Sequence, residues 1–182
     1  MLISVCQNLW NFTQRFLVLS LCLGIILCAL TSPAQARVQQ IEEAPGQIVY
    51  QARQTIRDQQ NQTWQVIAFQ RAKDSQMGHP YLRVVGFPGL TSIDPQLPLI
   101  MTNALGDRLI APPASENLFT DAANPEPHIA QYGLMEIIPK LNIAVPLRLE
   151  IPSLEKAVTL NISPSALFEW QNLTKSSRTP PE

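Results

Sequence analysis

The chain has little net charge and, beyond residue 28, no cysteine. Its 182 residues include 13 basic and 14 acidic side chains, which gives a formal charge of −1 at pH 7. This balance excludes a nucleic-acid binder that works by counterion release, because such proteins are strongly basic. The thiols are Cys6, Cys22 and Cys28, so cysteine nucleophiles and thiolate metal sites are excluded from the rest of the chain.

The first 36 residues have the features of an export signal. Arg15 is their only charged residue, and the uncharged apolar run 16–30 follows it. This run is shorter than the ~20 residues that a membrane-spanning helix needs, and the small residues Ala34 and Ala36 then form a cleavage site. We expect cleavage after Ala36 by the general secretory route, because no arginine pair precedes the run. The alternative is an uncleaved anchor, lengthened by the apolar residues 2–12.

Cleavage would leave 146 residues (182 less 36) with 12 basic and 14 acidic side chains, a formal charge of −2. An exported domain without disulfides depends on its hydrophobic core, and this length suffices for one such domain. We therefore expect a signal peptide over 1–36, a flexible leader over 37–46, one globular domain over 47–173 and a disordered tail over 174–182.

The mature part is rich in proline, which interrupts both helices and central strands. Of the 16 prolines, 15 follow residue 36, so long helices are excluded. Alternating apolar residues predict short strands joined in hairpins. The expected strands cover 47–56, 64–69, 81–87, 99–103, 108–110, 145–151 and 158–162.

Two short helices are predicted in the second half of the chain. An apolar stripe of helical period runs from Ala130 to Leu141 and predicts a helix that Pro139 ends near Ile138. Ser163-Pro164 offers an N-cap and a first-turn proline for the second helix. The predicted fold class is α+β, a single domain of mostly antiparallel β-strands with two short helices packed on the sheet.

The mature part contains none of the motifs that mark common catalytic or cofactor sites, such as G-x-S-x-G, the Walker A loop, the dinucleotide fingerprint or H-E-x-x-H. We therefore predict no catalytic residue, no cofactor and no metal. Asp121, Glu126 and His128 have the donor types of a metal site. However, a proline-rich loop is a poor preformed cage, so we favour no metal there.

Three residues are candidates for a partner surface: Arg83, Phe87 and His128. Arg83 alternates with core residues on a predicted strand, where a solvated face is the default interpretation. Phe87 either presents itself to a partner or ends a buried strand within the core, and we favour the core. Trp64 and Trp170 lie on apolar stripes, so we expect them in the core rather than at an interface.

Several short motifs follow one another along the chain. They are Ile56-Arg57-Asp58, Thr63-Trp64-Gln65-Val66, Leu82-Arg83-Val84-Val85-Gly86-Phe87-Pro88-Gly89, Gln131-Tyr132 and Glu169-Trp170-Gln171. In these motifs and their order, over about residues 47–172, the chain resembles an uncharacterised family of small exported cyanobacterial proteins. The resemblance implies a domain of unknown function, supplies no catalytic residues, and implies the periplasm or the thylakoid lumen as the compartment.

These observations favour a non-enzymatic binding or assembly module in the periplasm or thylakoid lumen. Its partner is unknown; a membrane-protein complex is one candidate, and we expect neither nucleic acid nor a permanent membrane span after cleavage. One alternative is a small-ligand or lipid carrier with a cavity between sheet and helices. Another is a hydrolase whose catalytic arrangement has no recognisable motif.

Overall fold

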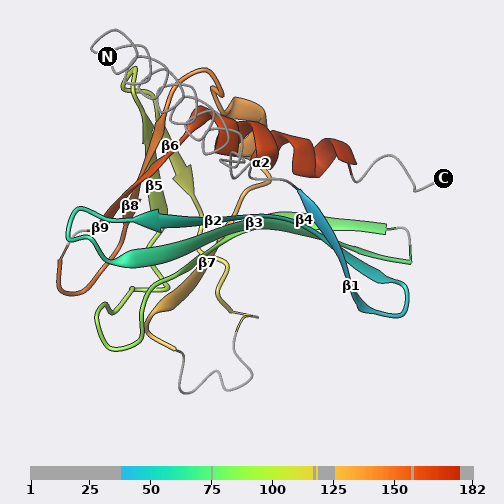
Figure 1. Ribbon diagram of the computed structural model, residues 1–182, viewed down its shortest axis with the longest axis horizontal. Helices are drawn as coiled ribbons and strands as arrows, with labels where there is room; N and C mark the ends of the chain where they lie inside the picture. The colour runs from blue at the N-terminus through green and yellow to red at the C-terminus, as the bar shows by residue number, and fades with distance from the viewer. Residues whose placement is uncertain (1–37, 75, 117, 119–125, 157, 177–182) are drawn as a thin grey trace, which may run out of the picture. The chain divides into compact units, whose positions relative to one another are not determined.

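Two antiparallel β-sheets and one α-helix make up the part of the chain that the structure describes (Figure 1). This structure is a computed structural model, and it describes residues 38–74, 76–116, 118, 126–156 and 158–176. None of the helices in these ranges has the length and apolar character needed to cross a membrane.

The larger sheet has five strands in the order β1-β2-β3-β4-β7. Its first four strands follow one another along the chain as hairpins, and β7 pairs antiparallel with β4. The turn between the second and third strands is fixed by Asp58, whose carboxylate accepts backbone N–H bonds from Gln60 and Gln62 at 2.9 and 2.8 Å. The strands are β1 (Gln39–Ala44), β2 (Gln47–Arg57), β3 (Thr63–Lys73), β4 (Gln76–Val85) and β7 (Ile129–Gly133).

The smaller sheet has four strands in the order β6-β5-β8-β9. The side chain of Asn103 closes the turn between β5 and β6, because its Oδ1 accepts N–H bonds from Leu105 and Asp107 at 2.9 Å each. The strands are β5 (Leu99–Asn103), β6 (Arg108–Ala111), β8 (Leu147–Ile151) and β9 (Val158–Ile162). The predicted hairpins in both sheets are therefore confirmed.

Helix α2 (Pro164–Ser176) packs on β2 and β3 of the larger sheet. It begins at the predicted proline, after Ser163, whose hydroxyl accepts the Ala166 N–H at 3.4 Å. One side of the helix is fully buried, including Leu167 and Trp170. The predicted second helix is confirmed.

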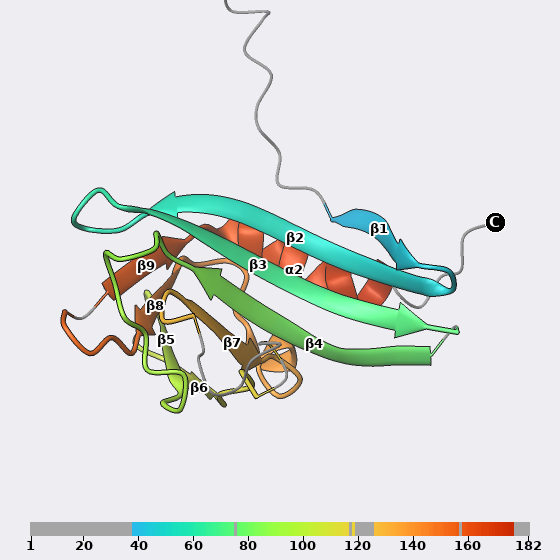
Figure 2. The ribbon, with the colours of Figure 1, turned by 90° about the horizontal axis from the view of Figure 1, so that it is seen from below.

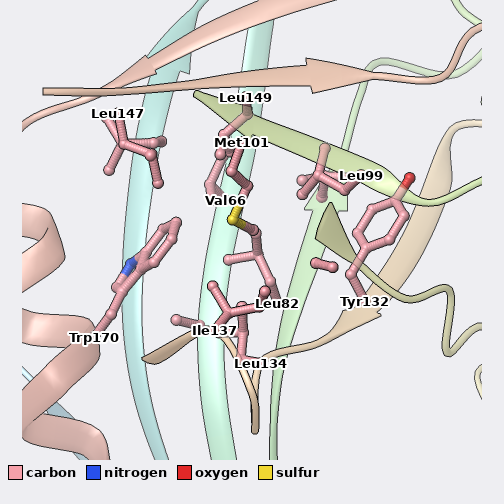
Figure 3. Close-up of a cluster of buried hydrophobic side chains, with 14 of the residues drawn as sticks. Val66, Leu82, Leu99, Met101, Tyr132, Leu134, Ile137, Leu147, Leu149 and Trp170 are labelled. Atoms are coloured by element: carbon pink, nitrogen blue, oxygen red, sulfur yellow. The ribbon is translucent and has the colours of Figure 1, made fainter. Parts of the chain in front are cut away.

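A single hydrophobic core joins α2 to one face of the five-stranded sheet and to the four-stranded sheet. We call this face of the larger sheet the inner face and the opposite one the outer face. Figure 3 shows Trp170 from the helix beside Leu147 of β8, with Met101 of β5 close to Val66 of β3. Each of these four side chains is at most 2% exposed. Figure 2 views β2 and β3 from the side opposite α2, which is the outer face.

The helix predicted from Ala130 to about Ile138 is wrong. This segment contains strand β7, a turn, and the short 3-10 helix η1 (Ile138–Lys140), so α2 is the only α-helix in the described residues. Ala130 and Tyr132 both point into the core because they are two residues apart on a strand. Pro139 is in the first turn of η1, where its missing N–H removes no helical bond.

Residues 39–44, expected in a flexible leader, form strand β1 at the edge of the larger sheet. The expected disordered tail begins inside α2, which continues to Ser176, and the rest of that tail lies outside the described residues. The expected signal peptide also lies outside them.

An irregular segment, residues 112–115, lies along β7 and covers the other edge of the larger sheet. The carbonyl of Pro112 accepts the Gly133 N–H at 2.9 Å, and the Ala114 N–H donates to the Gln131 carbonyl at 2.8 Å. Pro113 forms an isolated antiparallel bridge with Tyr132 between these two bonds. The segment therefore adds a short stretch of strand-like pairing to the edge of the sheet. Pro113 and Ala114 also border the outer face.

Candidate functional site

The outer face of the five-stranded sheet carries a small hydrophobic cluster of its own. Val49, Ile67 and Phe69 are buried there, with the half-buried Tyr81 packed against them. Phe69 lies opposite Tyr81 across β3 and β4, and their ring centroids are 5.9 Å apart. An aromatic pair on the face away from the main core gives this surface an apolar floor.

Two arginines lie over the ring of Phe69. The guanidinium carbons of Arg71 and Arg83 are each 5.0 Å from its centroid. Since both distances are measured to one centroid, the two carbons can be no more than about 10 Å apart. Phe69 is only 3% exposed, because the arginine side chains cover it, and cation–π attraction favours this arrangement.

Arg83 is the more deeply placed of the two cations and has unmet hydrogen-bonding capacity. One terminal nitrogen donates to the Gln131 side-chain oxygen at 2.9 Å. Its buried Nε has no hydrogen-bond partner within the described ranges. Burial lowers the pKa of the Arg83 guanidinium, the positive charge of Arg71 lowers it further, and the Glu43 carboxylate acts in the opposite direction.

The orientation of Arg83 is fixed by Gln131 of β7, which pairs with it across the sheet. The Gln131 side-chain nitrogen donates to the Ala114 carbonyl at 3.2 Å, which turns its oxygen toward the guanidinium. The backbone N–H of Gln131 donates to the Ser115 hydroxyl at 3.0 Å. Two strands and the irregular segment therefore hold one guanidinium in place.

Arg71 is paired with a carboxylate from the edge of the sheet. Its Nε and one terminal nitrogen donate to the two oxygens of Glu43 at 2.9 and 3.2 Å. Glu43 lies on β1, at the point where the pairing of β1 with β2 shifts register between Glu42 and Ala44. The hydrogen bonds from Arg71 lower the pKa of Glu43, partial burial acts in the opposite direction, and the charge of Arg71 lowers it further.

These groups surround an open hollow of about 620 Å³. This volume lies within the roughly 300–1,000 Å³ range typical of small-molecule sites. Glu116 is an exposed carboxylate of the lining, whereas Arg83 forms no ion pair with any described carboxylate. The lining includes Arg71, Tyr81, Arg83, Pro113, Glu116 and Gln131.

The lining groups are suited to binding. Guanidinium groups stay protonated at all physiological pH values and offer several donors in a planar fork. The amide of Gln131 adds directional hydrogen bonding, and the Tyr81 ring adds an amphipathic surface. This set can hold and orient an anionic or planar group.

The structure places Arg83 in this hollow but brings neither Phe87 nor His128 into its lining. Phe87 is 63% exposed, so the expectation that it belongs to the core is wrong. Its turn does lie next to His128, since the Gly86 N–H donates to the His128 carbonyl at 2.8 Å. Trp64 and Trp170 are 1% and 0% exposed, which confirms both as core residues.

His128 lies 3.5 Å from Glu126, measured between Nε2 and a carboxylate oxygen. The third residue considered for a metal site, Asp121, is outside the described residues. Within the described ranges, no group of three or more His, Cys, Asp or Glu side chains could hold a metal ion.

Phe69, Arg71 and Gln131 were not identified as site residues from the sequence, although they complete the site around Arg83. The one available signal is the run Val66-Ile67-Ala68-Phe69, which is apolar at successive positions. A strand that is apolar on both faces has both faces covered. The same run therefore indicates that the outer face of this strand is covered as well.

No curated protein and no solved structure matches the chain. Residues 36–173, more than half of the chain, match a family described as a protein of unknown function, DUF3122. The chain belongs to the DUF3122 family.

Proposed function

We propose that the protein is a non-enzymatic binding module that recognises its partner through the outer face of the five-stranded sheet. The observation that carries this proposal is the guanidinium of Arg83, which is half-buried with an unpartnered Nε within the described residues. A desolvated cation without a directly bonded ion-pair partner is unfavourable, so a partner that supplies an anionic acceptor would relieve that cost. The guanidinium of Arg71 and the amide of Gln131, which lie beside Arg83, are groups that bind and orient an acceptor.

The module is proposed to act outside the cytoplasm, in the periplasm or the thylakoid lumen of a cyanobacterium. The apolar run after Arg15 and the site at Ala34 and Ala36 support export. The family match begins at residue 36, beside the expected cleavage point. Mass spectrometry of the protein from fractionated cells should find Arg37 as its first residue, and retention of residues 1–36 would contradict cleavage.

A membrane-protein complex is the partner we propose to look for. The full chain with a C-terminal tag would be expressed in its host, and its partners captured from solubilised membranes. Arg83→Met should lose the partner, because Met keeps an apolar stem but removes the charge. Arg148→Met is the matched control, since Arg148 is an exposed arginine on β8 of the other sheet. Equal recovery with all three proteins would count against the outer face.

The carrier alternative requires an apolar cavity between sheet and helix. That layer is occupied by fully buried side chains from both sheets and α2, including Leu82, Leu149 and Leu167. Figure 3 shows Leu82 and Leu149 among them. The hollow instead lies on the opposite face and is lined by two arginines. The geometry therefore favours the binding module over a carrier of the kind considered.

A further inference from the structure

The geometry points to an oxyanion-binding site formed by Arg71 and Arg83, in which the Glu43 carboxylate is an internal competitor that the ligand displaces from Arg71. This inference rests on the proposed function and gives its ligand a chemical class: a carboxylate or phosphate group attached to a larger body. The two arginines differ in their charged partners, because Arg71 is paired with Glu43 and Arg83 forms no ion pair among the described residues.

Arg83 lines the hollow as a cation that forms no ion pair with any described carboxylate. Gln131 satisfies one of its terminal nitrogens at 2.9 Å, and the buried Nε is unpartnered within the described part of the chain. An oxyanion is the acceptor that best matches a guanidinium, because its two oxygens accept parallel N–H bonds. A neutral acceptor would leave the charge of Arg83 uncompensated.

The contacts of Arg71 show which kind of group its guanidinium binds. Both oxygens of the Glu43 carboxylate are bound by Arg71, at 2.9 and 3.2 Å. The pair is accessible, with side-chain exposures of 42% for Arg71 and 38% for Glu43, and exposed ion pairs are weak. Glu43 also lies on β1, an edge strand whose residues are all exposed. An external oxyanion can therefore replace Glu43 at small cost.

The ligand must be larger than a free anion. The hollow of about 620 Å³ exceeds the space that one oxyanion fills, and Tyr81 lies in its lining. An aromatic or other planar body could pack on the Tyr81 ring while its acidic group meets the arginines. Glu116 in the lining repels a second negative charge, which favours a ligand whose charge is concentrated at one end.

The test uses a matched set of small probes at constant ionic strength: benzoate, phenyl phosphate and the neutral benzamide. Binding to the exported protein would be followed by NMR signals of the Arg Nε–H groups and of the Gln131 side-chain amide. We expect benzoate, phenyl phosphate or both to shift the Arg83 and Gln131 signals, whereas benzamide should not. The stronger of the two anions identifies a carboxylate or a phosphate source.

Three variants check the assignment of roles. Arg83→Met should abolish the shifts at Gln131, and Arg148→Met should leave probe affinity unchanged. Glu43→Gln should raise probe affinity by about two- to fivefold, the range expected when a weak exposed ion pair no longer competes. Reduced affinity in Glu43→Gln would overturn the competitor role, and equal binding of benzamide and benzoate would overturn the oxyanion site.

The result is separable from the test of the proposed function. If Arg83→Met loses its membrane partner while no anionic probe binds, the binding module stands and the oxyanion site is wrong. If the probes bind at Arg83 while no partner is recovered, the oxyanion site stands and the partner-binding module is wrong.

Discussion

The two faces of the five-stranded sheet are built from alternate residues of the same strands, yet their chemistry is opposite. On β4, Leu82 is fully buried against the main core, and the next residue, Arg83, holds a cation on the outer face. The inner face is closed by α2 and the second sheet. Stability and recognition are therefore separated by one residue step along a strand, so substitutions on the two faces should have different consequences.

The largest loss of stability is expected when a buried side chain of the inner face is shortened. Leu82→Ala should lower the free energy of unfolding by about 2–5 kcal/mol, because it removes buried methyl groups and leaves a cavity. Urea unfolding of the variant and the parent protein would measure the difference. A loss below about 1 kcal/mol would contradict the description of Leu82 as a central core residue.

A second, smaller loss of stability is expected when a methyl group is added on the inner face where there is no space for it. A Cβ at Gly86 would come within 2.9 Å of the Trp64 ring, so Gly86→Ala should cost about 1–3 kcal/mol. Gly133→Ala is the matched control, since a Cβ there meets a Pro112 side-chain carbon at 3.4 Å, an ordinary contact distance. Equal melting temperatures for the two variants would contradict the tight fit at Gly86.

The outer face should respond in the opposite sense. Arg83→Met is expected to leave the free energy of unfolding unchanged or to raise it by up to about 1 kcal/mol, because a desolvated cation is removed and its apolar stem is kept. Arg148→Met should change it by less than about 0.5 kcal/mol. A loss above about 1 kcal/mol for Arg83→Met in urea unfolding would make Arg83 a structural residue.

The smallest effect concerns the pair between Glu43 and Arg71. The pKa of Glu43 in the folded protein is below its ordinary value of 4.5. The pair therefore stabilises the fold above pH 4.5, and this contribution is lost as the pH falls through the lowered pKa. Because the pair is exposed, the difference between the parent and Glu43→Gln should stay under about 0.5 kcal/mol at pH 7.

Unfolding of both proteins at pH values from about 2 to 7 would measure this difference. It should shrink toward acid, and added salt should reduce it at neutral pH. A difference that grows on acidification would contradict the assigned direction of the pKa.

The strands other than β1 and β7 were predictable because each leaves a local trace. Leu147, Leu149 and Ile151 alternate with polar residues, and the structure buries these three positions on one side of β8. The helix expected after residue 129 failed for a physical reason: Ala130 and Leu134 fit a helical stripe, but the intervening Tyr132 is also buried. A helix would place that residue away from the stripe, and a strand places it inward with Ala130.

The site could be predicted only in part, because its residues meet across the sheet. Arg83 was identified from its place on a strand, but its partner Gln131 lies 48 positions away, and Arg71 meets Glu43 over 28 positions. No spacing in the sequence indicates such pairs. They follow from strand order and register, which place β4 between β3 and β7.

The prolines along β7 have a consequence for how molecules of this protein meet one another. A bare sheet edge offers a row of N–H and C=O groups on which a strand from another molecule can pair. Here the edge of β7 is bonded by the segment that contains Pro112 and Pro113, and neither proline has an N–H to offer in turn. The sheet cannot be extended by intermolecular strand pairing at these two positions, which protects the protein from aggregation along that edge.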